Sequence, residues 1–397
     1  MGLIKLETLR FIRNKKNLTV FIAAILIVFI LFAITFVGAK RMDPLNEYQD
    51  NKSSLENAIS HMESNPNKSE AKKKALAGLQ EELRLRTEQI QAHEAGDWKQ
   101  ELKLQIALDK KLIAGINAGT IVFGNKKIVP QTEKAIQLNT ILLKQNIHPV
   151  IESFETPGIN FTYRILFYVF PFLMPLLIAV LIGDISTRDK QGGINHFVNV
   201  LPVKLKKILD ARIFTSFVYS LAITIVILVV ALIIGSIISH LGSWKYPVAI
   251  NLNGTEVLWI SIARFLGRSL LLILCLLLFI SVFTQFLNTF IRNQLLLMLV
   301  LVACFCFEEM MSGFKTKLYA VMHIIPFTFV DVPNIVNGES AAKFRNEYIN
   351  TTDGVITLLL SSLLFYFLTI WIIHKKNKIK KSLTNPKKRD KLNVSIF

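Results

Sequence analysis

The sequence predicts an all-α membrane protein with six transmembrane helices and a largely helical extracytoplasmic domain inserted between the first two. Hydrophobic residues make up 52% of its 397 residues, and the mean hydropathy is +0.45. They gather in six blocks, and about 20 apolar helical residues cross the roughly 30 Å hydrocarbon core of a bilayer. The predicted spans are 18–38, 162–183, 213–239, 269–287, 294–311 and 354–373.

The distribution of charge predicts how these spans are oriented. If the N-terminus lies in the cytoplasm, the segments 1–17, 184–212, 288–293 and 374–397 lie there too. Together they hold 21 Lys and Arg residues and five acidic residues, whereas segment 39–161 is nearly neutral, with 17 basic and 16 acidic residues. A basic surplus in short loops beside the spans is the positive-inside pattern. We therefore expect a multi-pass protein of the cytoplasmic membrane with both termini in the cytoplasm.

The first 17 residues combine leucine and isoleucine with five basic residues. This composition indicates either a short interfacial helix or a basic flank that merely orients the first span. The apolar block at 18–38 has 21 residues and is longer than the core of a signal peptide, which has about 7–15. We therefore expect an uncleaved membrane anchor.

Segment 39–161 is the largest predicted part outside the membrane. From Leu55 to Ile116 it is rich in strong helix formers, with breaks at Asn65-Pro66 and at Gly96. This pattern predicts an antiparallel helical hairpin or a small bundle. A strand-like piece over 120–129 and another helix over 131–145 are expected to follow.

The second predicted span contains Pro171 and Pro175. Each proline removes a backbone donor and favours a kink, which neighbouring helices can absorb. The remaining segments outside the membrane are the cytoplasmic loop 184–212, the outer loops 240–268 and 312–353, the inner loop 288–293 and the basic cytoplasmic tail 374–397.

No motif for bond chemistry is present. The sequence has no Gly-Lys dipeptide and therefore no phosphate-binding loop of the G-x-x-x-x-G-K-[ST] type. The seven histidines are scattered, and Cys275, Cys304 and Cys306 fall inside predicted spans, where we expect small apolar core residues. We expect no catalytic, cofactor or metal site in this chain. Nucleic-acid binding is not indicated either, because no stacking aromatics interleave with the basic residues.

The loop 184–212 carries the most informative pattern. Asp189 is followed four residues later by Gly193, and then by an apolar run that ends in Leu201-Pro202-Val203 before the next span. This layout resembles the loop between the second and third spans of ABC-2-type transporter permeases. The order of the spans, the basic N-terminal segment and the large domain after the first span resemble that family as well. The sequence departs from the family pattern at Ile194 and at Lys204-Leu205.

The resemblance implies a coupling element that docks on a separate ATPase subunit, which would bind the ATP. Phe197 and Leu201 would supply the apolar contact, and Asp189 and Lys204 would flank it. The partners implied are an ATP-binding cassette subunit and a second permease subunit, identical or different. The ordinary alternative is a basic inside loop without a docking role.

Glu308 and Glu309 lie near the outer end of the fifth predicted span. A carboxylate at membrane depth is costly and is often functional, for example at a gate or a cation site. Within one turn of the boundary, however, the side chains can also reach water, so the alternative is an interfacial position without function.

Two functions are consistent with these features. The first is the membrane-spanning subunit of an ATP-driven exporter of an amphipathic peptide, antibiotic or lipid-like molecule. The second is a non-transporting membrane sensor or secretion-apparatus scaffold with an extracytoplasmic binding domain. Only the first accounts for the Asp189, Gly193 and Pro202 layout. A membrane enzyme would need clustered polar residues within the spans, and few are present.

Overall fold

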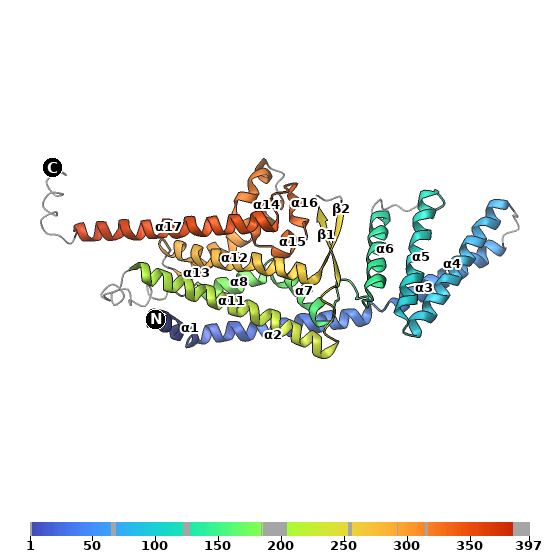
Figure 1. The fold of residues 1–397 in the computed structure, drawn as a ribbon, viewed down its shortest axis with the longest axis horizontal. Helices are drawn as coiled ribbons and strands as arrows, with labels where there is room; N and C mark the ends of the chain where they lie inside the picture. The colour runs from blue at the N-terminus through green and yellow to red at the C-terminus, as the bar shows by residue number, and fades with distance from the viewer. Residues whose placement is uncertain are drawn as a thin grey trace.

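The structure, a computed structural model, describes residues 2–64, 69–121, 128–183, 185, 205–252, 256–291, 293–313 and 317–383. In this part of the chain nearly all regular structure is helical, with one two-stranded hairpin. Figure 1 shows an elongated molecule in which a bundle of long helices is followed at one end by a row of shorter ones, α3 to α6. We call this end the domain end, and the opposite one, which carries α1, the basic end.

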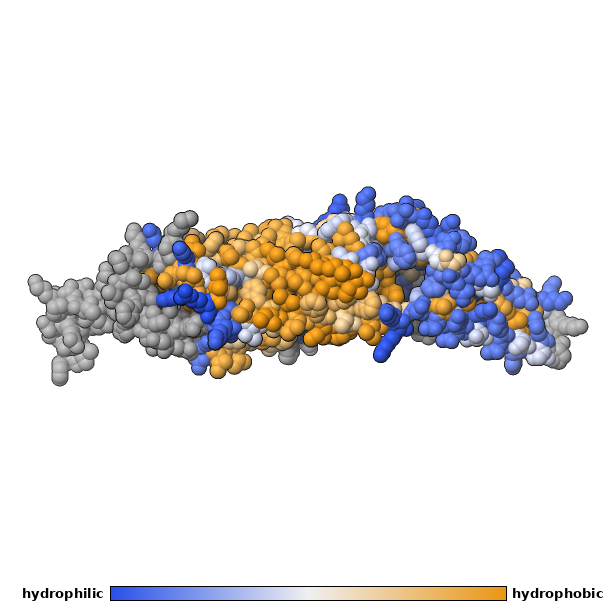
Figure 2. Space-filling view, turned by 90° about the horizontal axis from the view of Figure 1, so that it is seen from below, coloured by the Kyte–Doolittle hydropathy of each residue, from blue (hydrophilic) through white to orange (hydrophobic). Residues whose placement is uncertain are grey.

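Four helices among the described residues are long and apolar enough to cross a membrane, which indicates a membrane protein. Figure 2 shows the apolar belt that they form, with hydrophilic residues gathered over the domain end. The helices are α2 (Lys15–Arg41), α11 (Leu205–Ile238), α12 (Ile262–Asn288) and α17 (Thr351–Leu383).

The other two predicted spans have a different form. The segment 162–183 corresponds to α7 (Gly158–Val169) and α8 (Leu173–Ile182), which are bent by 72° at a break next to Pro171. The segment 294–311 is divided into α13 (Gln294–Phe305), which has 12 residues, and the short α14 (Phe307–Ser312). Among the described residues there are thus four single helices that could span a membrane, or five candidates if the bent pair is counted as one.

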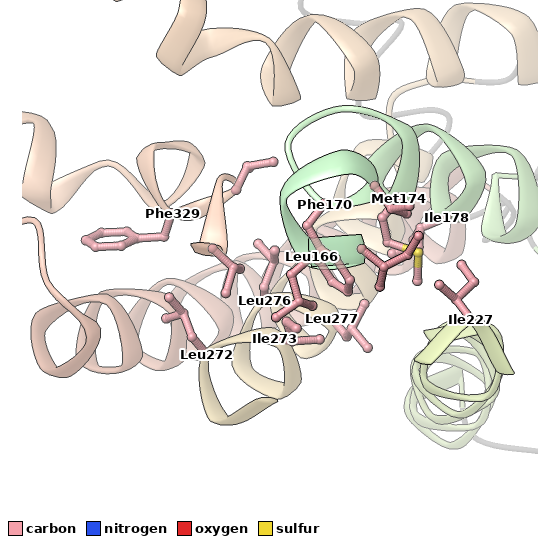
Figure 3. Packing of buried hydrophobic residues seen from close by; sticks show 14 of the residues in the cluster. Leu166, Phe170, Met174, Ile178, Ile227, Leu272, Ile273, Leu276, Leu277 and Phe329 are labelled. Atoms are coloured by element: carbon pink, nitrogen blue, oxygen red, sulfur yellow. The ribbon is translucent and has the colours of Figure 1, made fainter. Parts of the chain in front are cut away.

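Helix α12 forms the centre of the bundle. Two thirds of its most apolar 18-residue stretch is buried, against a third or less for α2, α11 and α17. Figure 3 shows Leu272, Ile273, Leu276 and Leu277 of α12 within the central cluster of buried apolar side chains. The large apolar side chains that α2, α11 and α17 leave exposed are suited to contact with lipid.

A pair of glycines lets α7 and α11 pack closely near the domain end. A Cβ added at Gly235 of α11 would lie 2.7 Å from Gly158 Cα and 2.9 Å from Thr156 O. The backbone N–H of Gly158 donates to His240 O at 2.8 Å, so the chain that leaves α11 closes over the start of α7. Small residues at such crossings allow helix backbones to approach one another within a membrane.

The domain end confirms the predicted helical character of segment 39–161 in its described part. Its helices are α3 (Pro44–Ser64), α4 (Glu70–Glu94), α5 (Trp98–Asn117) and α6 (Ile128–Gln145). Ser69 and Asp97 cap α4 and α5 through their side chains, and Gly96 adopts a φ of +72° in the turn between them. Of the predicted strand-like piece 120–129, residues 122–127 lie outside the described part, and the last two belong to α6.

The segment 240–268, which was predicted as an outer loop, contains a β-hairpin that was not expected from the sequence. Strand β1 (Pro247–Leu252) pairs antiparallel with β2 (Glu256–Ser261), with Ala249 opposite Trp259. The second strand leads directly into α12, which therefore begins seven residues before the predicted span. Strand β1 is joined to the segment after α13, because Asn251 N donates to Asn337 O at 2.8 Å.

Short helices from this later segment complete the domain end of the bundle. They are η1 (Lys317–Ile324), η2 (Pro326–Phe329), α15 (Val332–Val336) and α16 (Glu339–Phe344). Phe329, which is fully buried, packs into the central cluster and anchors η2 beside α12.

We predict that Gly235→Ala destabilises the protein, because the added methyl group meets the backbone of α7. Overpacking of this kind lowers the free energy of unfolding by about 1–3 kcal/mol. Gly267→Ala in α12 is the matched control, since a Cβ there meets nothing within 4 Å and alanine favours a helix by about 1 kcal/mol. Thermal unfolding midpoints of the purified variants in one detergent measure the difference. Equal midpoints for the two variants would show that the close α7–α11 contact does not exist.

Candidate functional site

The six residues proposed for ATPase coupling lie outside the described residues. They are Asp189, Gly193, Phe197, Leu201, Pro202 and Lys204. The structure does describe where their loop is attached. It follows α8, the second half of the bent pair, and it precedes α11, the longest of the described helices. A movement of this loop would therefore act directly on the bent pair and on α11.

The end of α8 is held by the second helix of the chain. Lys16 at the start of α2 donates from its Nζ to Val180 O at 2.6 Å. Carbonyl groups in the last turn of a helix lack helical partners, and a cation there also complements the helix dipole. Asn14 caps α2 by accepting from Lys16 N at 3.2 Å, which positions the lysine.

Helix α1 (Gly2–Ile12) lies against the first turns of α11. The ring of Phe11 stacks on Tyr219 at a centroid distance of 3.6 Å, and buried Glu7 approaches Arg212 Nε at 3.8 Å. On its other side α1 leaves large apolar residues exposed, among them Leu9 and Ile12. Residues 2–12 are thus helical, and the interfacial position of this helix stays a prediction.

The beginning of α11 is also tied to the last helix. Tyr366 of α17 donates from its hydroxyl to Asp210 Oδ1 at 2.8 Å. The contacts of α1, α2, α8 and α17 thus surround the two attachment points of the loop at the basic end (Figure 1). Among the described side chains here, Lys206 and Lys207 are exposed. Through these contacts, a movement of the loop would reach α1, α2, α8, α11 and α17.

The two predicted carboxylates have different surroundings. Glu308 is 4% exposed and accepts a hydrogen bond from Ser340 Oγ at 2.9 Å, whereas Glu309 is exposed and pairs with Lys343 Nζ at 2.9 Å. Both partners belong to α16, so the structure fixes α14 to that helix. It does not bring the two carboxylates together as one cation site.

A third carboxylate, Asp331, lies close enough to act electrostatically on Glu308. It caps α15 and accepts from Asn334 Nδ2 at 2.8 Å. Burial raises the pKa of Asp331 above its usual value, and the hydrogen bonds from Asn334 partly oppose this. Within the described part of the chain, no three His, Cys, Asp or Glu side chains gather as metal ligands.

A buried ion pair that was not expected from the sequence lies at the domain end. Arg164 of α7 forms a two-pronged contact with Glu155, with its Nε donating to Oε2 at 2.6 Å and a second nitrogen to Oε1. The two side chains are only 17% and 9% exposed. Nine residues separate them and α7 starts in between, so neither helical nor strand periodicity could have indicated the pair.

Comparisons with protein-family models, with curated proteins and with solved structures found no match for this chain. The resemblance to ABC-2-type permeases therefore rests on the loop residues and on the order of the elements alone.

We predict that Ser340→Ala destabilises the protein by about 1–3 kcal/mol, because it leaves the buried carboxylate of Glu308 without its donor. Lys343→Ala on the same helix removes the partner of exposed Glu309. We expect it to lower the free energy of unfolding by less than about 1 kcal/mol. Unfolding midpoints in a common detergent compare the two. A larger loss for Lys343→Ala would contradict the assignment of Glu308 as the buried member.

Proposed function

We propose that this chain is the membrane-spanning permease subunit of an ATP-driven exporter. It would move an amphipathic substrate, such as a peptide, an antibiotic or a lipid-like molecule, across the cytoplasmic membrane. The ATP would be bound and hydrolysed by a separate ATP-binding cassette subunit, and two permease subunits, identical or different, would form the pathway. The observation that carries the proposal is the attachment of the Asp189–Lys204 loop between the bent α7–α8 pair and α11.

The proposed topology has six spans, with the bent pair as the second and the segment 294–311, which comprises α13 and α14, as the fifth. The basic end then faces the cytoplasm and α3 to α6 lie outside, as the positive-inside pattern favours. The charged side chains Lys206 and Lys207 at the start of α11 would lie on the side where the ATPase is available.

In this proposal the ATPase acts through rigid elements. Helix α11 has 34 residues and is about 51 Å long at 1.5 Å per residue, so it reaches from the loop to the domain end. A push on the loop would tilt α11 and would change the bend between α8 and α7. Shifts of packed helices of this kind are a common way to transmit a conformational change.

The contacts of Lys16 with Val180 and of Glu7 with Arg212 link α2 and α1 to this movement. These two contacts hold the end of α8 and the start of α11 against α2 and α1 at the basic end. The function of Glu308 and Glu309 as a gate or cation site stays a prediction.

We predict that Phe197→Asp and Leu201→Asp each weaken binding of the ATPase subunit by about tenfold or more, since a buried apolar contact is replaced by a charge. Asn199→Asp is the matched control, because it adds the same charge to the same loop without removing an apolar side chain. Co-purification of the ATPase in mild detergent, together with ATP-dependent transport in reconstituted vesicles, measures both effects.

Normal co-purification and transport in the Phe197 and Leu201 variants would contradict the coupling role. If the wild-type chain co-purified with no ATPase at all, the exporter proposal would be wrong. A sensor or secretion-apparatus scaffold would then account for the chain better.

A further inference from the structure

Three helices of the domain end meet close to the point where α2 enters it. Helix α4 packs against both α3 and α5 (Figure 1). Asp43 stands between α2 and α3, His93 lies in the last turn of α4, and Glu101 lies in the first turn of α5. Helix α5 is fixed toward the bundle, because Trp98 at its start and Tyr246 before β1 pack on the same small cluster of buried apolar residues.

Glu101 receives contacts from both of the other helices. Its Oε1 accepts a hydrogen bond from the hydroxyl of Tyr48 in α3 at 3.0 Å and lies 3.1 Å from His93 Nδ1. The side chains of Glu101 and His93 are 15% and 26% exposed, so salt and water screen their contact only in part. The rings of His93 and Tyr48 also meet edge to face at a centroid distance of 6.1 Å. These contacts hold the imidazole between α3 and α5.

The other ring nitrogen of His93 faces a second carboxylate. Its Nε2 lies 3.3 Å from Asp43 Oδ1. The same oxygen accepts from Leu45 N at 3.1 Å, which holds the Asp43 side chain in place at the start of α3. His93 therefore has a carboxylate oxygen beside each of its two ring nitrogens.

This arrangement suits only one protonation state of the imidazole. An ionised carboxylate can only accept hydrogen bonds, and only the imidazolium form donates from both ring nitrogens. A neutral imidazole has a single N–H, so its second nitrogen presents a lone pair to a carboxylate and that contact becomes repulsive. Histidine is also the side chain that ordinarily changes its charge between about pH 5 and 8.

The other titratable groups around His93 keep their charge in this range. Burial and the adjacent Glu101 carboxylate raise the pKa of Tyr48, so its hydroxyl stays protonated and continues to donate. The guanidinium carbon of Arg86 in α4 lies 5.3 Å from the centroid of the Tyr48 ring, and Glu47 of α3 acts on the same tyrosine electrostatically. Arginine and glutamate ordinarily do not titrate between about pH 5.5 and 8. Among these residues, His93 alone therefore changes its charge.

We propose that this group of side chains is a pH-sensitive clasp that fastens the end of α4 to the starts of α3 and α5. The clasp consists of Asp43, Tyr48, His93 and Glu101. It is closed when His93 is protonated, and when His93 is neutral the end of α4 is released from one of the two carboxylates. The stabilisation belongs to the protonated form, so it is present at low pH and is lost as the pH rises.

The position of Asp43 gives the clasp a consequence for the membrane-spanning part. Asp43 directly follows the chain that leaves α2, so opening of the clasp loosens the junction between the first long helix and the domain end. The clasp goes beyond the proposed exporter function, because its opening requires neither the ATPase subunit nor transport.

Hydrogen–deuterium exchange of the full-length protein, purified in detergent without any partner, tests the clasp. The quantity compared is the protection factor of the backbone amides in the last turn of α4 at about pH 5.5 and at about pH 8. A protection factor is the ratio of intrinsic to observed exchange rates, which removes the pH dependence of the exchange reaction itself. We expect it to fall about three- to tenfold at the higher pH, because a charge-assisted contact is lost.

Variants assign this change to the clasp. His93→Gln should abolish the pH effect, and Asp43→Asn, which keeps an oxygen to cap α3, should reduce it to less than about half. His61→Gln is the matched control, since His61 is exposed on α3 near the opposite end of that helix from Tyr48. It should leave the full effect in place.

A protection factor of the wild-type protein that is the same at both pH values would overturn the clasp. A pH effect that persists in full in both His93→Gln and Asp43→Asn would also overturn it, as would its loss in His61→Gln. The side chain of Asp43 is 48% exposed, so its variant decides the question even if His93→Gln does not fold.

Discussion

The packing of the apolar helices around α12 is the constraint on which the rest of the structure depends. In lipid, a helix satisfies its own backbone, and neighbouring helices gain chiefly from close van der Waals contact. Helix α12 is buried along most of its length, whereas α2, α11 and α17 place apolar side chains outward. A broken segment such as α7–α8 is tolerated because the bundle covers it, and Phe170 at the break is almost fully buried.

Most of the specific polar contacts between elements lie at the two ends of this bundle. At the basic end, Lys16 holds α8, and Tyr366 joins α17 to α11. At the domain end, the ion pair between Arg164 and Glu155 joins the segment before α7 to that helix. Helix α11 connects the two ends: it begins where the 184–212 loop leads into the bundle, and its Gly235 contacts Gly158 at the start of α7. A movement of the loop would therefore reach the domain end through this helix.

Hydropathy predicted the apolar elements well, because an uninterrupted block of about 20 apolar residues is typical of a helix that crosses a membrane. It could not predict that 162–183 bends by 72°, since Pro171 shows where a kink is permitted but not how large it becomes. The β-hairpin was missed although its two mostly apolar six-residue strands flank Asn253-Gly254, a dipeptide that is typical of hairpin turns. Adjacent Glu308 and Glu309 are equivalent in sequence, and their different burial arises from α16, which is distant along the chain.

The orientation of the bundle is the claim on which the proposed coupling role of the 184–212 loop depends. An epitope tag inserted at Ala95–Gly96, in the turn between α4 and α5, tests it in cells with an intact membrane. We predict that this tag is reached by antibody from outside, whereas a tag after Phe397 is reached only once the membrane is permeabilised. The opposite result, a protected tag at 95 and an accessible C-terminus, would contradict it, because the proposed ATPase contact would then face away from the cytoplasm.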